Sequence, residues 1–360
     1  MIYLDYQATT PLAPEAREAM LPWLSPEGSA NPHSSHAPGR AAKAAVELAR
    51  EQIGTLLPAG GQIYFTSGAT EAANWALRGT GARRVSVAAT EHAAVLDTAL
   101  WMGASGADVT VLPVDDGGIV DTGSLPKGTD LIAVMLVNNE IGTIQPVDTV
   151  AALAPDALIF CDAVQGYGRV AIPEGADLVA ISAHKIHGPK GIGALWVRDG
   201  VTIEPLLHGG GQEGGLRSGT LSPALCAGFG AAAAIAASRL EADQSHVERL
   251  WEGARSLLGS DWTVNGSIGA RYHGNLNIRR EGLDAARLIS ELRDIAFSAG
   301  SACASGSGRP SHVLKAIGLS TVEARSSIRI GFGRYTTGTE LSDALDRITA
   351  AADAQGRVAA

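Results

Sequence analysis

The sequence has 360 residues, of which 46% are hydrophobic and 18% charged, and its formal net charge is -9. This length favours two or three domains, and the apolar content is sufficient for a sizeable core. The acidic balance argues against a general nucleic-acid or anionic-membrane binder, because such surfaces require clustered Lys and Arg.

The composition also limits the compartment and the covalent chemistry. The longest apolar stretch, residues 131–137, is far shorter than the ~20 residues that a membrane-spanning helix requires. Residues 1–5 lack a basic region followed by a long apolar run, so we expect no secretion signal and a cytoplasmic location. The cysteines are too few and too scattered for a disulfide framework or a metal site: Cys161, Cys226 and Cys303.

Strand-like apolar runs alternate with helical patterns along the first two thirds of the chain. Helices are predicted over residues 14–24 and 41–57, with an irregular loop between them. Short apolar runs predict strands at 63–66, 85–88, 109–112, 131–137, 157–161, 178–181 and 193–197. Apolar strands separated by helices predict an α/β fold, with a mostly parallel seven-stranded sheet covered on both faces.

The last third of the chain has a different organisation. A helical pattern over residues 222–258 is long enough to bridge two bodies, and we place a domain boundary inside it, near residue 243. Strand-like and helix-like segments follow in mixed order, which predicts a smaller α+β domain. We therefore predict a large domain over residues 13–243 and a small domain formed by 1–12 and 244–360.

Lys185 follows the predicted strand 178–181, in the stretch Ser-Ala-His-Lys-Ile-His-Gly-Pro-Lys-Gly of residues 182–191. The chain has only five lysines, so this position does not belong to a lysine-rich surface. Desolvation lowers the pKa of a lysine, and the neutral amine can then form a Schiff base with a carbonyl. A lysine that neutralises a nearby carboxylate explains the stretch equally well.

Further polar residues follow other predicted strands, at the edge of the sheet where α/β proteins bind ligands. The small-residue turn before Glu71 leads into a helix, and its backbone N–H groups and the Thr70 hydroxyl can bind a phosphate. An ordinary helix cap is the alternative. Asp162 follows strand 157–161, where it suits a protonated pyridine nitrogen, and Gln165 can bond a ring hydroxyl.

Together these residues predict pyridoxal phosphate as the cofactor. It requires a Schiff-base lysine, a phosphate site and a carboxylate that keeps its pyridine nitrogen protonated. His92 can stack on the ring and move protons. Singly, an Asp at a strand end is more often a turn residue, and a lone His is more often structural; their occurrence at successive strand ends favours the cofactor.

Segments along nearly the whole chain resemble the cysteine desulfurases of the class V aminotransferase superfamily, in the branch that serves iron-sulfur and nitrogenase assembly. The matching segments are residues 3–11, 66–71, 90–92, 137–142, 162–165, 182–191, 217–220 and 300–303, together with Arg329. The resemblance implies the type I fold of pyridoxal-phosphate enzymes. It also implies L-cysteine as the substrate and a homodimer.

The family's roles carry over residue by residue onto these segments. The implied cofactor-binding residues are Ala69, Thr70, His92, Asn139, Asp162, Gln165, Ser182, His184 and Lys185, with Thr220 reaching the phosphate of the partner subunit's cofactor. Asn139 and Arg329 bind the substrate, and Arg329 holds its α-carboxylate as a planar bidentate donor. Lys185, Cys303 and His92 are the implied catalytic residues.

Cys303 distinguishes this reaction from others on the same fold. Residues 298–308 are small and glycine-rich, so we expect a mobile, accessible loop, whereas Cys161 and Cys226 lie in apolar segments. The resemblance implies that the Cys303 thiolate attacks the substrate sulfur and becomes a persulfide. L-alanine leaves, the sulfur passes to an acceptor protein, and His92 moves the substrate thiol proton.

The sequence also departs from the family, and it permits other functions. Gly214 and Gly215 stand where the family often has an arginine, Arg309 follows Gly308 where an apolar and an acidic residue are commoner, and the segment after the last predicted helix, 341–354, is short. The acceptor protein therefore stays open. A selenocysteine lyase or another β-eliminating enzyme is the second hypothesis, because fold and cofactor do not determine the reaction. A weakly catalytic sulfur-carrier platform is the third.

Overall fold

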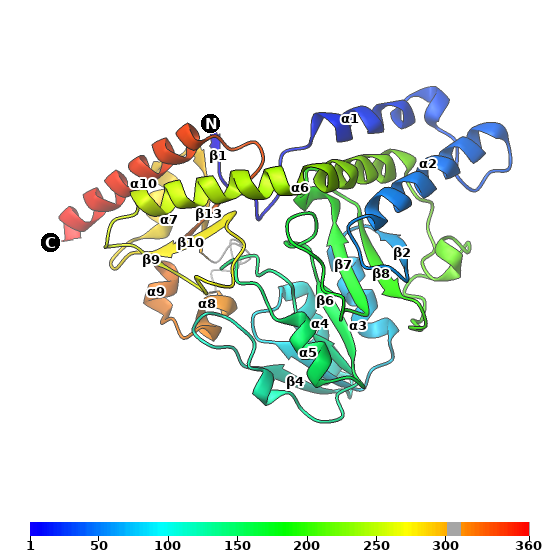
Figure 1. Cartoon of the computed structure of the whole chain (residues 1–360), viewed down its shortest axis with the longest axis horizontal. Helices are drawn as coiled ribbons and strands as arrows, with labels where there is room; N and C mark the ends of the chain where they lie inside the picture. The colour runs from blue at the N-terminus through cyan, green and yellow to red at the C-terminus, as the bar shows by residue number, and fades with distance from the viewer. Residues whose placement is uncertain (301–310, 360) are drawn as a thin grey trace.

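The computed structural model describes residues 1–300 and 311–359, and Figure 1 shows its course. Within these residues a seven-stranded sheet has the order β2-β8-β7-β6-β5-β3-β4. The strands are β2 (Gly61–Thr66), β3 (Arg84–Ala88), β4 (Asp108–Leu112), β5 (Leu131–Ala133), β6 (Leu158–Asp162), β7 (Leu178–Ser182) and β8 (Gly193–Arg198). Neighbours pair in parallel except β8, which runs antiparallel to β2 and β7. The predicted α/β class is confirmed.

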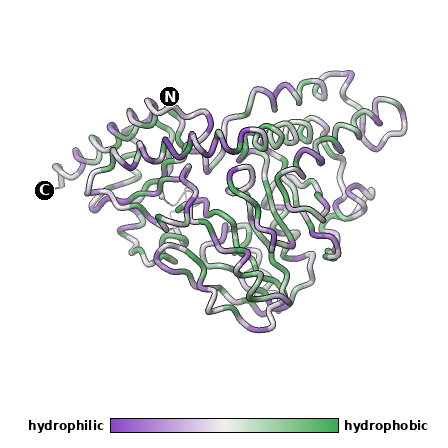
Figure 2. The backbone as a smooth tube through the Cα atoms, in the orientation of Figure 1, coloured by the Kyte–Doolittle hydropathy of each residue, from purple (hydrophilic) through white to green (hydrophobic). Residues whose placement is uncertain are grey.

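Helices cover both faces of this sheet, as the near-continuous apolar strands require. The helices of this part of the chain are α1 (Pro14–Met20), α2 (Ala37–Gly54), α3 (Ala69–Gly79), α4 (Ala93–Ala104), α5 (Val147–Leu153) and the first half of α6 (Pro223–Leu257). Along β7, Leu178 and Ala180 pack with α3 and α4, whereas Val179 and Ile181 pack with α2 and α6. Figure 2 shows hydrophobic residues along these central strands.

A smaller antiparallel sheet lies at the other end of the molecule, in the order β12-β13-β10-β9. Its strands are β9 (Thr263–Val264), β10 (Asn275–Arg279), β12 (Ser298–Ala299) and β13 (Ser327–Gly331), and beside it β1 (Ile2–Tyr3) pairs in parallel with β11 (Ile295–Ala296). The helices here are α7 (Ala285–Glu291), α8 (His312–Ala316), α9 (Thr321–Arg325) and α10 (Gly338–Ala359). The N-terminal arm therefore joins this smaller body, and the division of domains at residue 243 stays a prediction.

Helix α6 connects the two bodies (Figure 1). Cys226 and Phe229, in its first half, belong to the core of the large sheet, and Leu250 and Trp251, in its second half, belong to the core of the small one. Among the helices described, only α6 is long and apolar enough to cross a membrane by composition. Its apolar half is packed against α1 and α2, as in a core helix.

Two predicted elements have other bounds for local reasons. Strand β5 ends at Ala133, although the apolar run continues to residue 137. The Met135 N–H turns to the Glu91 carboxylate, while Val134 and Leu136 still donate to the β6 side. Helix α2 begins at Ala37 because the His36 ring accepts a hydrogen bond from Gly39 N at 3.2 Å and caps the helix.

Candidate active site

The carboxyl ends of β2, β5, β6 and β7 meet at one edge of the large sheet and border a cavity of about 620 Å³. Ten of the twelve sequence-predicted site residues line it: Ala69, Thr70, His92, Asn139, Asp162, Gln165, Ser182, His184, Lys185 and Arg329. Thr220 is exposed in the segment between β8 and α6 and does not line this cavity. Cys303 lies outside the described residues.

Lys185 ends a single turn of 3₁₀ helix, η4 (Ala183–Lys185), which directly follows β7. Its Nζ donates to the main-chain carbonyls of Gln7 and Ala8, the latter at 2.8 Å. Both of these acceptors are carbonyl oxygens of the N-terminal arm. These hydrogen bonds hold the amine at the cavity wall, and the neighbouring Asp162 carboxylate interacts with it electrostatically.

Asp162 ends β6 on the floor of the cavity, where it is 6% exposed. Burial raises the pKa of its carboxyl group, while the neighbouring His92 and Lys185 favour the charged form. Val164 N donates to Asp162 Oδ1 at 3.0 Å and orients the group. A protonated pyridine nitrogen at this position would balance the charge of the buried carboxylate.

His92 precedes α4 and caps it, since its Nδ1 accepts a hydrogen bond from Ala94 N at 3.1 Å. Burial lowers the pKa of the His92 ring, so the ring is neutral near pH 7. In the neutral tautomer the proton is then on Nε2. His92 therefore presents an N–H donor and a ring face, rather than a cation, to a ligand.

The turn between β2 and α3 has the features of a phosphate site. Its N-cap, Gly68, has no side chain to accept from the first N–H groups of α3, which leaves them for an anion. A Cβ atom on Gly193 would lie 2.8 Å from the carbonyl carbon of Gly68, so glycine is required where the turn approaches β8. His184, which follows β7 and lines the same cavity, is a further predicted phosphate ligand. Burial and the nearby Lys185 lower its pKa to about 4.

An ion pair fixes this turn from the side of the later loop. Glu71 accepts from Ser67 N at 2.7 Å and from Arg217 Nε at 2.7 Å. Glu213, in the same loop as Arg217, pairs with Arg50 of α2 at 2.8 Å. The segment that carries Thr220 is thereby anchored to the phosphate turn.

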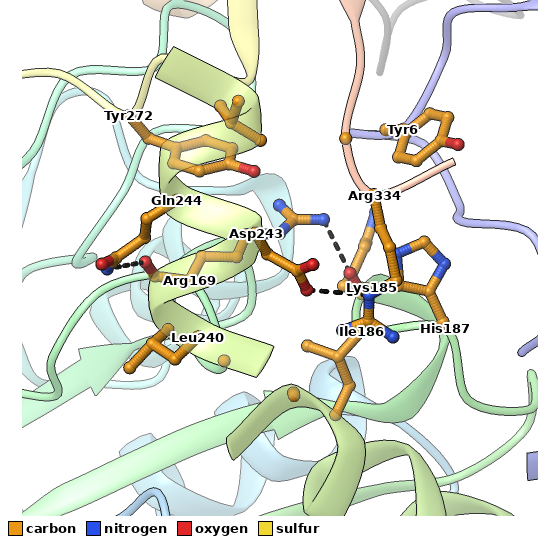
Figure 3. A pocket seen from close by; sticks show the side chains of 14 residues that line it. Tyr6, Arg169, Lys185, Ile186, His187, Leu240, Asp243, Gln244, Tyr272 and Arg334 are labelled. Carbon is orange, nitrogen blue, oxygen red and sulfur yellow. Dashed lines mark hydrogen bonds and ion pairs between the residues drawn. The ribbon is translucent and has the colours of Figure 1, made fainter. Parts of the chain in front are cut away.

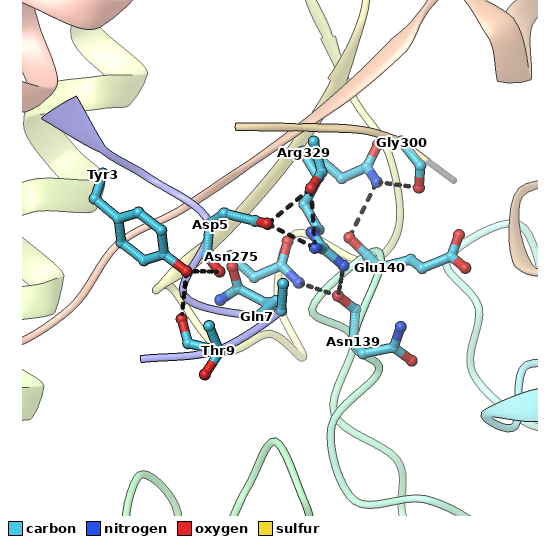
Figure 4. Close-up of polar contacts among 12 residues, drawn as sticks. Tyr3, Asp5, Gln7, Thr9, Asn139, Glu140, Asn275, Gly300 and Arg329 are labelled. Atoms are coloured by element: carbon cyan, nitrogen blue, oxygen red, sulfur yellow. Dashed lines mark hydrogen bonds and ion pairs between the residues drawn. The ribbon is translucent and has the colours of Figure 1, made fainter. Parts of the chain in front are cut away.

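Arg329 reaches the cavity from the opposite side, on β13, and is 1% exposed. Its Nη1 donates to Asn139 O at 3.0 Å, and its Nη2 donates to Asp5 Oδ1 at 2.8 Å (Figure 4). Nε has no partner among the described residues. A ligand carboxylate at this guanidinium would share it with Asp5.

Several contributors were missed from the sequence. Gln7 and Ala8 contribute carbonyl oxygens, which no side-chain motif reveals, and Asp5 lies in a segment whose match to the family was noted without a role. Glu91 is fully buried, and desolvation together with the nearby Asp162 raises its pKa well above the ordinary value. Its position next to His92 was the signal that could have indicated it.

Comparison with known proteins decides the family. Residues 2–343 match the model of the aminotransferase class-V family. A cysteine desulfurase IscS of Rickettsia rickettsii (strain Iowa) is 42% identical, over 98% of this chain and 91% of its own. The chain belongs to the cysteine desulfurases of the class V aminotransferase family.

Solved structures agree with this assignment. A NifS-like protein has 32% identity and a TM-score of 0.89, over 97% of this chain and 98% of its own. The structure of SspA in complex with cysteine has 34% identity and a TM-score of 0.82, over 94% of this chain and 100% of its own. The desulfurase has the type I fold of pyridoxal-phosphate enzymes, as predicted, and its family implies that cofactor.

The described residues fit pyridoxal phosphate. The cavity provides a lysine amine, a buried carboxylate and a helix N-terminus without a side-chain cap, at the ends of three strands of one sheet. These are the partners of an aldehyde, a pyridine nitrogen and a phosphate. The roles of the single residues remain predictions.

Proposed function

We propose that this desulfurase holds pyridoxal phosphate through Lys185, with Asp162 at the pyridine nitrogen and the Ala69–Thr70 turn, Ser182 and His184 at the phosphate. Bound there, the cofactor supplies an electron sink for the bond changes at the substrate. The single observation that carries this proposal is the cavity wall on which Lys185, Asp162 and His92 come together from three different strand ends.

L-cysteine enters between this wall and Arg329. The Arg329 guanidinium binds the α-carboxylate, and Asn139, which also lines the cavity, contacts the substrate from the same side. A related solved structure is described as SspA in complex with cysteine, which supports a cysteine site in this fold. The half-buried Asp5 keeps the buried Arg329 in position, so the guanidinium is oriented before the substrate arrives.

Cys303 takes the sulfur of the substrate. Its thiolate attacks the substrate sulfur, an S–S bond forms, the Cβ–S bond breaks, and the carbon skeleton is protonated and released as L-alanine. The described segment that follows this cysteine is hydrogen-bonded to residues next to the cavity lining. Ser311 Oγ donates to Glu140 Oε2 at 2.5 Å, and the His312 ring hydrogen-bonds Glu91 O at 2.8 Å. These contacts adjoin Asn139 and His92.

His92 contributes a hydrogen bond from Nε2, because its Nδ1 is engaged with Ala94 N. Its service as the acid or base for the substrate thiol stays a prediction. Neutral imidazole near pH 7 suits stacking on the cofactor ring, since it adds no charge beside Asp162.

The desulfurase acts as a cytoplasmic homodimer that delivers sulfur to an acceptor protein, for iron-sulfur clusters or another thio-cofactor. Thr220, which the resemblance assigns to the phosphate of the partner subunit's cofactor, is exposed and does not line its own cavity, which is compatible with that role. Light scattering on the eluting protein measures the dimer directly.

The decisive experiment combines colour and product. Purified protein with pyridoxal phosphate is expected to absorb visible light, and borohydride followed by peptide mapping should fix the cofactor on Lys185. Lys185→Ala should lose both the absorbance and the release of alanine from L-cysteine, while Lys190→Ala, a neighbouring lysine, should keep the covalent attachment. Attachment to another lysine in Lys185→Ala would contradict the proposal.

A further inference from the structure

Arg169 lies behind the cofactor side of the cavity, in the turn after β6, outside every sequence motif used above. Its Nη1 donates to Gln165 Oε1 at 2.8 Å, and Gln165 Nε2 donates to Gln7 O at 2.9 Å. Arginine only donates and a main-chain carbonyl only accepts, so both neighbours require the same orientation of the Gln165 amide. The amide nitrogen is therefore on the side of Gln7, which also lines the cavity.

The same guanidinium holds the main chain of the cofactor lysine. Arg169 Nη2 donates to Lys185 O at 2.6 Å. One planar side chain thus joins Gln165, after β6, to Lys185, after β7. A guanidinium has several donors in a rigid plane and can serve two acceptors together, whereas a lysine ammonium is a single point of attachment.

Arg169 is itself held in place from three directions. Its guanidinium lies over the Tyr272 ring, 5.2 Å from the centroid, and Gln244 Nε2 donates to Arg169 O at 2.9 Å (Figure 3). The turn depends on Gly168, whose φ of +71° a side chain rarely adopts, and a Cβ atom there would lie 3.1 Å from Ile186 Cγ2. The smaller body thereby supports Arg169, which in turn contacts Gln165 and Lys185 on the sheet side of the cavity.

We infer that Arg169 is a positioning residue for the cofactor: it orients the Gln165 amide so that an N–H faces the ring hydroxyl oxygen, and it fixes the backbone of Lys185. The inference rests on the proposed function, in which Gln165 and Lys185 contact pyridoxal phosphate. One N–H of Gln165 is used by Gln7 O, and the second serves the ring oxygen.

The test is the pH dependence of the visible absorbance of the bound cofactor in Arg169→Met and Arg169→Lys. An N–H donor stabilises the negative charge of the ring hydroxyl oxygen. When the donor is lost, the oxygen keeps more of that charge and stabilises the protonated form of the nearby Lys185 nitrogen. In Arg169→Met the pH midpoint of the absorbance change should therefore rise by about one unit, which corresponds to the free energy of about one hydrogen bond. Arg169→Lys, which keeps the charge but reaches one acceptor, should shift less.

Two further variants separate positioning from general damage. Arg169 and Arg334 both line a small cavity of about 40 Å³ that is distinct from the active-site cavity. Arg334→Met removes an arginine that pairs with Asp243 at 2.8 Å and has no described contact to Gln165 or Lys185. It should leave the midpoint unchanged. In a Gln165→Leu background, Arg169→Met should add little shift, because the amide that it orients is gone.

The outcomes distinguish the two proposals. If the unaltered protein with pyridoxal phosphate has no visible band, the proposed function fails. If the band is present but the midpoint of Arg169→Met equals that of the unaltered protein, or Arg334→Met shifts as much, or the shifts of Gln165→Leu and Arg169→Met add fully, Arg169 has only a structural role. Circular dichroism of each variant verifies that it is folded.

Discussion

The two sides of the active-site cavity are constructed differently. On the sheet side, His92, Asp162 and Lys185 lie at or within four residues of the ends of β3, β6 and β7, and local contacts such as Val164 N to Asp162 Oδ1 help to orient them. On the opposite side, Arg329 reaches across the chain to Asp5 and Asn139. The first side depends on sheet topology, and the second depends on the docking of the N-terminal arm and the small sheet.

This difference separates the cofactor from the reaction. The sheet side holds the residues proposed to bind pyridoxal phosphate, and a cofactor site does not by itself select the reaction. Arg329, the proposed partner of the substrate carboxylate, lies on the other side, on β13 of the small sheet. Variants on the two sides should therefore separate the colour of the protein from its turnover.

The largest expected effect is that of Cys303→Ser. A serine hydroxyl is a far weaker nucleophile than a thiolate, so alanine and sulfide formation from L-cysteine should fall by at least about 1,000-fold. The visible absorbance should stay, because this change leaves the sheet side intact. Cys226→Ser, at a buried cysteine of α6, is the matched control. Full turnover by Cys303→Ser would assign the reaction to another β-eliminating chemistry.

Arg329→Lys should have an intermediate effect on the substrate alone. Lysine lacks the planar pair of donors for a carboxylate, so KM for L-cysteine should rise by about 10-fold to 100-fold with the absorbance retained. Arg279→Lys, on the neighbouring strand β10, contacts Asn265 rather than the cavity and should leave KM unchanged. A loss of cofactor absorbance in Arg329→Lys would show that the two sides are not separable.

The smallest expected effect is on the pH dependence of stability and concerns His187. Its ring contacts Pro11 O of the N-terminal arm at 2.9 Å. Burial, with Arg334 nearby, lowers the pKa of His187 from 6.5 to about 3. The unfolded chain binds this proton below about pH 6.5 and the folded chain does not, so stability falls as pH decreases through this range.

His187→Asn removes this titration and suits the backbone, since His187 has φ of +70°, which Asn tolerates. Urea unfolding should show that the unaltered protein loses on the order of 2–3 kcal/mol more than His187→Asn between pH 6.5 and pH 4. Equal pH dependence in both proteins would mean that the histidine is not buried in its neutral form.

Most of the sheet side could be predicted from the sequence. A buried parallel strand has an unbroken apolar run, and the polar residue that ends the run must lie at the edge where ligands bind. Asp162 follows such a run directly, and Lys185 comes four residues after another. The end of β5 was misjudged, since the Met135 N–H is satisfied by the Glu91 side chain, and a run of apolar letters carries no information about that partner.

The sequence by itself determined the family, the α/β fold and the residues that follow each strand, because periodicity and motif spacing are local properties of the chain. Only the tertiary structure decided that the Gln7 and Ala8 carbonyls receive Lys185, that Asp5 shares Arg329, and that Arg169 joins Gln165 to Lys185. Those contacts use main-chain atoms or join segments far apart along the chain. Their partners are chosen by packing, which no local pattern encodes.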